Sequence, residues 1–312
     1  MAGPQRATNH PDYSSGSASR FIPEIWSGKL IEKLYDYTCL AEISNTDYEG
    51  EIKQKGDKVV IRTTPTMVIK DHKTGQKLGY DTPESDSIEL NVDQAKYFAF
   101  RCEDVDAYQS DLNLINDWSD DAGQQMQIEI DTSVMARFYA DASPENAGDG
   151  AGRKSGGYNM GAAGAPVALN KTSILDYIVD AGSVLDEQNV PNENRWIVLP
   201  SWANGMLKKS DLRDASVMGD AKSVFRNGKV GELDRFTVYI NNNLSMEMDA
   251  NGNQVTHIPF GHKKSLTFAS QMTEMDQLKD PYQFGQLVRG LNVYGWKVID
   301  PKAMGHMVAA RG

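Results

Sequence analysis

The sequence predicts an α+β fold, and three observations support this. Runs rich in β-branched residues or alternating in polarity at 57–69 and 87–93 are typical of paired strands. One apolar stripe at helical spacing covers about 111–142, and shorter helix and strand signals alternate after about residue 165. Because 312 residues is about twice a usual domain length, we expect two domains or one large mixed domain.

The N-terminal 20 residues are polar and rich in Ser, Gly and Pro, without an apolar period, so they predict an arm that is flexible on its own. They lack the apolar core of a signal peptide, and we therefore expect the chain to be made and used in the cytoplasm. From Phe21 to Ile43, a proline near the start and apolar residues at three- and four-residue spacing indicate a short amphipathic helix.

The two strand signals flank a polar segment. Together, the strands and this segment predict a long hairpin with a mobile tip. An eleven-residue strand would span roughly 36 Å at about 3.3 Å per residue. A hairpin of that length is too polar at its tip to bury itself against one small domain, so we expect it to reach toward another molecule. The tip residues are Lys70, Asp71, Lys73, Gly75, Lys77 and Gly79.

The strongest helical signal begins at a capping Asp111 and continues to about residue 142. Thirty-two residues at 1.5 Å each give a rod of roughly 48 Å, which suits a scaffold. Glycine in a helix interior costs about 1 kcal/mol relative to alanine, so Gly123 indicates either close packing against a neighbour or a bend point. The apolar stripe is Leu112, Ile115, Trp118, Ala122, Met126, Ile130 and Val134, and the opposite face is expected to carry Asp117, Asp120, Asp121, Gln124 and Asp131.

A Gly- and Ala-rich loop at 143–166 separates this helix from an alternating region. There we expect a helix from Thr172 to about Gln188, a buried strand RWIVL and a helix after Pro200. Strands FTVYI, VTHIPF and KSLTFAS follow, with DANGNQ as a hairpin turn, and LVRGLNVYGWKVI is expected to close the chain as a long strand.

The net charge of −11 argues against a nucleic-acid-binding chain, because phosphate contacts need Lys and Arg. Residues 101–143 hold ten acidic residues against two arginines. This segment is either a solvated helix face or a surface that repels a nearby polyanion. Cys39 and Cys102 cannot form a disulfide framework, and buried, reduced thiols are expected.

The sequence contains no residue pattern typical of an enzyme active site. GDGAGRKSGG has Arg153 where a phosphate-binding loop needs glycine, and no strand precedes it. His257 and His262 are five residues apart, whereas a zinc hydrolase helix needs four. Asp120 and Asp121 point to different sides of a helix. We therefore expect no catalytic residue, no cofactor and no metal.

Six phrases, in order from about Phe21 to Met304, resemble the major capsid protein of tailed bacteriophages. They are FIPEIWSGKLIEKLYDYT, NTDYEGEIKQKGDKVVIRTTPT, QSDLNLINDWSDDAGQQM, NRWIVLPSWANGMLKKSDL, RNGKVGELDRFTVYINNNL and VRGLNVYGWKVIDPKAM. The order of elements is similar to that family's Hong Kong 97-type fold. The resemblance implies an N-terminal arm and short helix at 1–48, an extended hairpin loop at 49–100, a peripheral domain with the spine helix at 101–164, an axial domain at 165–280 and a return strand to the peripheral domain at 281–312.

The resemblance further implies a structural protein, not an enzyme, that assembles with itself into pentamers and hexamers of an icosahedral shell. The shell would enclose double-stranded DNA without binding it specifically, and no membrane is involved. Only about 20 residues precede the first matched phrase, so a separate scaffolding protein is expected, together with a portal protein and an optional decoration protein. The expected location is the virion capsid, assembled in the cytoplasm of the bacterial host.

The resemblance also gives two features of the spine helix a role. Its acidic residues Asp117, Asp120, Asp121 and Asp131 would face the enclosed DNA, and Gly123 would be the hinge of a helix that bends in the precursor shell and straightens as the shell expands. Two alternatives remain open at this point. One is a bacterial nanocompartment shell with the same fold, and the other is a cytosolic hydrolase.

Overall fold

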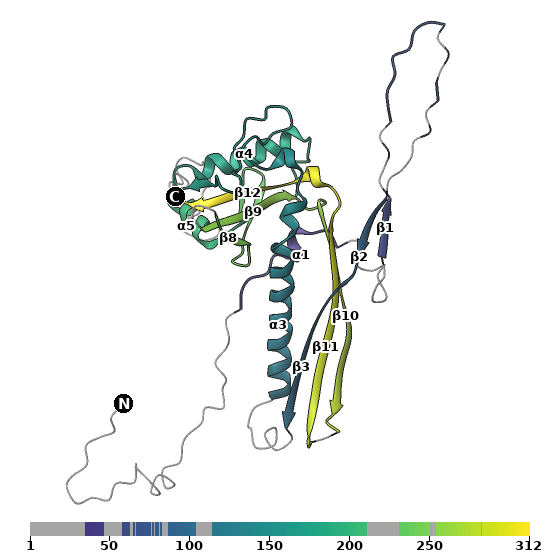
Figure 1. The fold of residues 1–312 in the computed structure, drawn as a ribbon, viewed down its shortest axis with the longest axis vertical. Helices are drawn as coiled ribbons and strands as arrows, with labels where there is room; N and C mark the ends of the chain where they lie inside the picture. The colour runs from purple at the N-terminus through teal and green to yellow at the C-terminus, as the bar shows by residue number, and fades with distance from the viewer. Residues whose placement is uncertain are drawn as a thin grey trace, which may run out of the picture.

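The computed structural model is elongated, with a long helix and a narrow sheet extending from a compact unit, and a hairpin projecting the other way (Figure 1). The chain's first described residue is Tyr35. The residues described are 35–46, 58–62, 65, 67–75, 77, 79–80, 82, 87–103, 114–210, 231–249, 252, 254–281 and 283–312.

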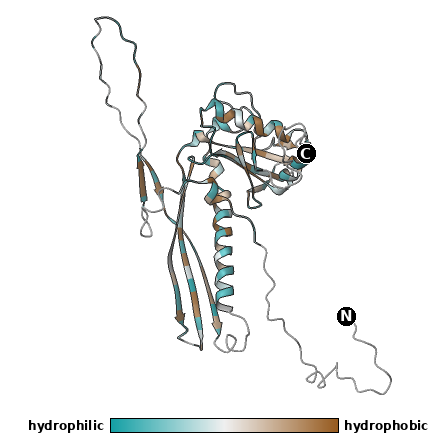
Figure 2. Ribbon diagram, turned by 180° about the vertical axis from the view of Figure 1, so that it is seen from behind, coloured by the Kyte–Doolittle hydropathy of each residue, from teal (hydrophilic) through white to brown (hydrophobic). Residues whose placement is uncertain are grey.

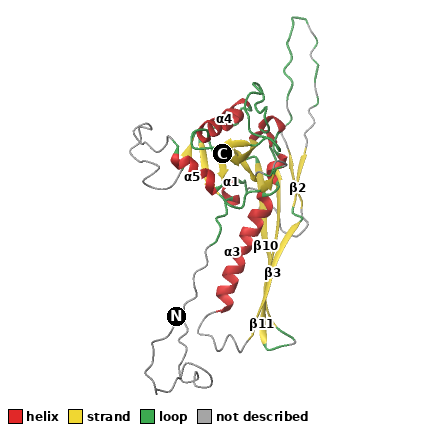
Figure 3. Cartoon of the chain, turned by 60° about the vertical axis from the view of Figure 1, so that its left-hand side comes forward, coloured by secondary structure: helices red, strands yellow, loops and turns green. Residues whose placement is uncertain are grey.

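The spine of the molecule is helix α3 (Leu114–Met135), which lies beside a three-stranded antiparallel sheet (Figure 3). The sheet has the order β10 (Leu266–Lys279), β11 (Gly285–Val298), β3 (Gln94–Glu103). From α3, the apolar residues Met126, Ile130 and Val134 are buried in one cluster with Phe268, Tyr294 and Val298 of the sheet. The apolar stripe predicted for this part of the helix is confirmed.

The helix ends earlier than the predicted residue 142, and 22 of its residues are described. It ends at Met135, because Arg137 leaves helical geometry with φ −130° and ψ −38°. A 3₁₀ turn, η3 (Phe138–Asp141), follows and places Phe138 in the core. The predicted start at Asp111 and Leu112 lies outside the described residues.

The hairpin forms where predicted, but its strands are short. Strand β1 (Lys58–Arg62) pairs in antiparallel register with β2 (Ser87–Asn91), so the predicted eleven-residue strand is wrong. Alternate residues Val59 and Ile61 are buried against β10 and β11, and they hold the base of the hairpin on the sheet. The chain then passes directly from β2 into β3, which pairs with β11 and not with the hairpin.

The compact unit is built on a seven-stranded mixed sheet. Its order is β4 (Val167–Leu169), β12 (Met304–Arg311), β9 (Gln254–His262), β5 (Arg195–Leu199), β7 (Phe236–Ile240) and β6 (Glu232–Leu233), with β8 (Met246–Met248) paired to β9. Helices α4 (Ile174–Glu187) and α5 (Ser201–Lys209) pack on one face. In Figure 2 the apolar colour gathers in this unit, whereas the visible face of α3 is mostly hydrophilic.

Strand β5 shows why the predicted RWIVL strand is buried along its whole length. Ile197 and Leu199 point into the core shared with α4 and α5. Trp196 and Val198 point into the other core, with Phe138 at the top of the spine. Because side chains alternate between two covered faces, every position of β5 is buried, and its one polar residue, Arg195, is paired.

Most other predicted elements of this unit are confirmed, including the helices near 172–188 and after Pro200 and the hairpin turn before β9. The expectation that LVRGLNVYGWKVI closes the chain is wrong. After β11 comes β12, which lies inside the seven-stranded sheet between β4 and β9, so the last strand joins the compact unit and not the sheet beside the spine.

The predicted amphipathic helix from Phe21 to Ile43 is wrong in its described part. Helix α1 covers Leu40–Ile43 alone, and residues 35–39 are not helical. Leu40 and Ile43 pack into the core at the top of the spine, whereas Tyr37 is 53% exposed. The remainder of the prediction lies outside the described residues.

Candidate functional site

The projecting hairpin carries an exposed apolar surface. Met67, Val68, Ile69 and Tyr80 are 60%, 70%, 91% and 92% exposed, respectively. Exposed apolar side chains gathered on one segment mark an interaction site in a soluble protein. The pattern at 57–69 predicted a strand and not an exposed surface. The signal for the surface was the apolar run Met67–Ile69 directly before the polar tip.

The predicted tip residues lie at the turn of this hairpin, where all six are exposed. Gly75 has φ +86°, a left-handed conformation that favours glycine, and it therefore makes the turn. The ammonium nitrogen of Lys70 lies 4.0 Å from the point where a Cβ would be attached at Gly79. The two arms of the hairpin are therefore close together here. The six residues are Lys70, Asp71, Lys73, Gly75, Lys77 and Gly79.

The predicted acidic face of α3 is only partly correct. Asp117 and Asp120 are exposed. Asp121 is half-buried and accepts a hydrogen bond from the Tyr35 hydroxyl at 2.9 Å. Asp131 is 1% exposed, so its assignment to the interior acidic face is wrong. It lies one turn before the buried Met135, on the side of the helix that faces the core.

Asp131 is instead the centre of a buried polar network. Its Oδ1 accepts the backbone N–H groups of Cys39 at 3.3 Å and Leu40 at 3.1 Å. Its Oδ2 accepts the side-chain amides of Asn241 at 2.7 Å and Asn243 at 3.0 Å. One carboxylate thus joins α1, the spine and the segment after β7, and it is satisfied by four neutral donors.

The thiol of Cys39 lies beside this network and accepts a contact from the Asn241 amide at 3.3 Å. Burial first, and then the adjacent Asp131, raises the pKa of Cys39 to about 12. A thiol protonated at neutral pH is a poor nucleophile. Cys39 and Cys102 are both buried and free, as the sequence predicted.

Gly123 lies between two differently anchored parts of the spine. On its C-terminal side are the buried Met126 and Ile130, followed by the Asp131 network. On its N-terminal side Trp118 makes an edge contact with Phe100, with ring centroids 5.8 Å apart. A Cβ at Gly123 would meet no atom of the described residues within 4 Å, so packing within the chain does not explain the glycine.

The Gly-rich loop at 143–166 contains an anion cradle that the protein fills itself. Glu187 Oε2 accepts the backbone N–H groups of Lys154 at 2.7 Å and Ser155 at 3.1 Å. These backbone hydrogen bonds lower the pKa of Glu187. The backbone amides of Lys154 and Ser155, which could otherwise bind a phosphate, are occupied by the Glu187 carboxylate. This agrees with the sequence prediction that the loop is not a phosphate-binding loop.

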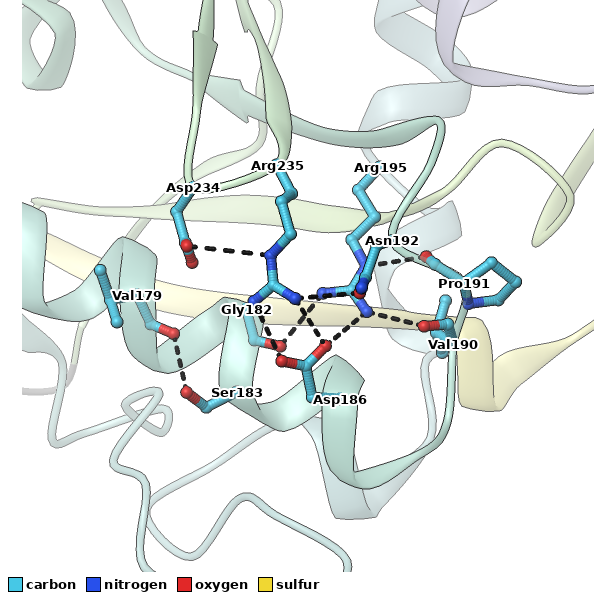
Figure 4. A network of polar contacts seen from close by, with 10 residues as sticks. All are labelled: Val179, Gly182, Ser183, Asp186, Val190, Pro191, Asn192, Arg195, Asp234 and Arg235. Carbon is cyan, nitrogen blue, oxygen red and sulfur yellow. Dashed lines mark hydrogen bonds and ion pairs between the residues drawn. The ribbon is translucent and has the colours of Figure 1, made fainter.

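A second network fixes α4 to the seven-stranded sheet (Figure 4). Arg195 is fully buried, and it donates to Asp186 Oδ1 at 2.6 Å and to the carbonyls of Pro191 and Val190. Arg235 donates to the other oxygen of Asp186 at 3.0 Å. Burial alone would raise the pKa of Asp186, but the hydrogen bonds from the two guanidinium groups outweigh it and lower the pKa. The Asp186 carboxylate is paired with both guanidinium groups, which indicates a structural role.

The described residues contain no group of three or more His, Cys, Asp or Glu side chains that could hold a metal. His257 and His262, considered as a metal pair in the sequence, have separate roles. His257 stacks on Tyr139, and His262 Nδ1 accepts the backbone N–H of Lys264 at 3.1 Å. No helix in the described part of the chain is long and apolar enough to cross a membrane.

The architecture is similar to that of several solved phage structures. A structure from Mycobacterium phage Che8 has 26% identity and a TM-score of 0.73, over 92% of this chain and 96% of that one. The capsid of Cyanophage P-SCSP1u has 14% identity and a TM-score of 0.69, over 98% and 100% of the two chains. The mature capsid of bacteriophage PhiM1 has 17% identity and a TM-score of 0.67, over 98% of each. Comparison with curated proteins gives no match.

A spine helix beside a narrow sheet, a compact second unit and a projecting hairpin define a Hong Kong 97-type capsid fold. The family model for phage capsid proteins matches residues 88–306, and the chain therefore belongs to the phage capsid protein family. Its function is that of a major capsid protein, a structural subunit that associates with its own copies in the virion capsid.

Proposed function

We propose that the chain forms pentamers and hexamers of an icosahedral shell that encloses double-stranded DNA, and that the hairpin is the contact by which one subunit holds the next. The observation that carries this is the exposed apolar run Met67–Ile69 on an arm that projects away from the body (Figure 1). Such a surface is stabilised when a second copy covers it. Many modest contacts of this kind then hold a closed shell together.

Substituting Val68 and Ile69 by Ser tests this proposal. Both side chains are more than two-thirds exposed, so the fold of the subunit should be unchanged. We expect closed shells to disappear from negative-stain images while the subunit keeps its circular dichroism and thermal unfolding. Deletion of 70–79 should have the same effect. Val179→Ser is the matched control, because Val179 is 49% exposed on α4 and away from the hairpin. Normal assembly by the hairpin variants would overturn the proposal.

The exposed acids of the spine are proposed to face the genome. Like-charge repulsion would keep DNA from adhering to the shell wall, which allows packing and release. Asp117 and Asp120 are the residues that support this role, since Asp131 is buried and Asp121 is bonded to Tyr35.

The test replaces Asp117 and Asp120 by Lys and measures the retention of DNA on empty shells. We expect stronger retention at low salt that falls steeply as salt is added. Asp176→Lys on α4 is the control for a general change of charge. If the spine variant retains no more DNA than this control, the acidic face serves solubility only.

The remaining partners follow from the proposed shell. A separate scaffolding protein would direct assembly, a portal protein would occupy one vertex, and a decoration protein is an optional partner outside. Assembly would take place in the cytoplasm of the bacterial host. Co-expression of the chain with and without the phage's other structural proteins, followed by imaging of the particles, tests the need for a scaffolding protein.

A further inference from the structure

Three aromatic rings meet where the spine joins the seven-stranded sheet. Tyr139 of η3 stacks on His257 of β9, with ring centroids 4.2 Å apart and planes inclined by 16°. His306 of β12 lies 5.4 Å from Tyr139 and 5.7 Å from His257. The three rings, called here the His–Tyr cluster, therefore connect η3, which directly follows the spine, to two central strands of the sheet.

The polar atoms of this cluster are poorly satisfied. The Nδ1 atoms of His257 and His306 are buried, and neither has a hydrogen-bond partner among the described residues. Neutral imidazole tolerates one such nitrogen as an empty acceptor, but imidazolium carries a proton on both nitrogens. Protonation would place a donor without an acceptor at each buried Nδ1, and a buried donor that makes no hydrogen bond destabilises the closed arrangement.

The charges around the cluster offset this cost only at one ring. Glu247 of β8 lies 4.0 Å from His257 Nε2 and accepts a hydrogen bond from the Tyr139 hydroxyl at 3.5 Å. Helices α4 and α5 pack on the opposite face of the sheet. The charged groups on the other elements packed against β9 and β12 are Asp141 on η3, Glu145 on η4 (Pro144–Asn146), Lys302 on η6 (Pro301–Ala303) and Arg195 on β5.

We propose that the His–Tyr cluster is a proton-operated joint between the spine and the seven-stranded sheet, closed while His257 and His306 are neutral and loosened when they take up protons. Two imidazolium rings 5.7 Å apart would also repel each other in a partly buried setting. The joint acts within one subunit, so it goes beyond the proposed shell role and does not depend on it.

The direction of the pH effect follows from burial. Burial, and then the neighbouring His257, lowers the pKa of His306 from 6.5 to about 4. Burial likewise lowers the pKa of His257, and Glu247 opposes the shift. The open form takes up a proton at higher pH than the closed form. The stability of the closed joint is therefore complete above pH 6.5 and is lost as the pH falls toward 4.

Hydrogen exchange of the full-length protein at pH 7 and pH 5 tests the joint, with rates corrected for the intrinsic effect of pH. From the shift of His306 alone, the protection of amides in η3, β9 and β12 should fall about 20-fold relative to that of amides in β10 and β11. His306→Phe keeps a ring without a titrating nitrogen, and it should make the loss clearly smaller than in wild type, with only the contribution of His257 left. His72→Gln, which removes an exposed histidine of the hairpin tip, should leave it unchanged.

Two results would overturn the joint. One is unchanged amide protection in β9 and β12 of the wild-type protein between pH 7 and pH 5. This measurement does not depend on any variant. The other is an equal loss of protection in wild type and His306→Phe. If His306→Phe does not fold, His257→Phe takes its place, and there the loss should be smaller than in wild type.

Discussion

Substitution of Gly123 gives a specific test of whether the spine helix bends and straightens at this residue. Replacing it by alanine adds a methyl group that meets no described atom within 4 Å, so there is neither a clash nor new burial. The remaining effect is helix propensity, which favours alanine by about 1 kcal/mol. That gain exists only where residue 123 is helical. Gly123→Ala should therefore stabilise a straight spine by about 1 kcal/mol for each subunit, or roughly fivefold in the equilibrium constant, and a bent spine by less.

The assay is the expansion of assembled precursor shells as the temperature is raised, followed by light scattering or imaging. If the spine bends in the precursor shell and straightens on expansion, Gly123→Ala lowers the expansion temperature. The matched control is Gly205→Ala in α5, where an added Cβ also meets no described atom within 4 Å. Gly205→Ala should stabilise the subunit by a similar amount and leave expansion unchanged.

The hinge would be refuted by an unchanged or higher expansion temperature in Gly123→Ala. A shift equal to that of Gly205→Ala would also contradict it, because the effect would then be general stabilisation. A higher temperature with a less stable mature shell would indicate that a neighbouring subunit packs against Gly123.

Three further predictions concern the polar networks. Asp131→Asn replaces a carboxylate that accepts four hydrogen bonds with an amide, which itself carries a donor. The free energy of unfolding, measured in urea, should fall by about 2–4 kcal/mol. The control Asp117→Asn, at an exposed position, should change it by less than about 0.5 kcal/mol. Glu187→Gln weakens the hold on two backbone amides, so limited proteolysis should cleave the Gly-rich loop faster than in wild type; equal rates would contradict the cradle. The lowered pKa of Asp186 means that its pairing with Arg195 and Arg235 contributes stability above the ordinary pKa of 3.8 that is lost as the pH falls further. Asp186→Asn should remove this part of the acid sensitivity in pH-dependent unfolding.

The sequence predicted the parts of the fold that depend on strong periodicity. The stripe through Met126, Ile130 and Val134 identified the spine, and the apolar run Trp196–Leu199 identified a central strand. Strand β12 was missed because its segment MGHMVAAR holds small residues and methionines and only one β-branched residue. Its place in the sheet is fixed by tertiary contacts with β9 and β4, which no local pattern contains.

Asp131 shows why the candidate site was harder to predict than the fold. An aspartate among other acids is usually solvated, and the sequence placed it on the polar face. It is buried because donors more than 90 residues away in the chain converge on it, two from Cys39 and Leu40 and two from Asn241 and Asn243. The hairpin posed the opposite problem, since Val68 and Ile69 follow a strand-like pattern but are exposed in the single chain.

The projecting hairpin is expected to join this subunit to its own copies. The most direct measurement is the mass of the purified full-length chain by multi-angle light scattering, with the Val68 and Ile69 double Ser variant measured beside it. We expect capsomers of five or six chains of 34.5 kDa each, or megadalton particles, for wild type and single subunits for the variant. A wild-type chain that stays a monomer or dimer at every concentration, or a variant that assembles like wild type, would contradict it.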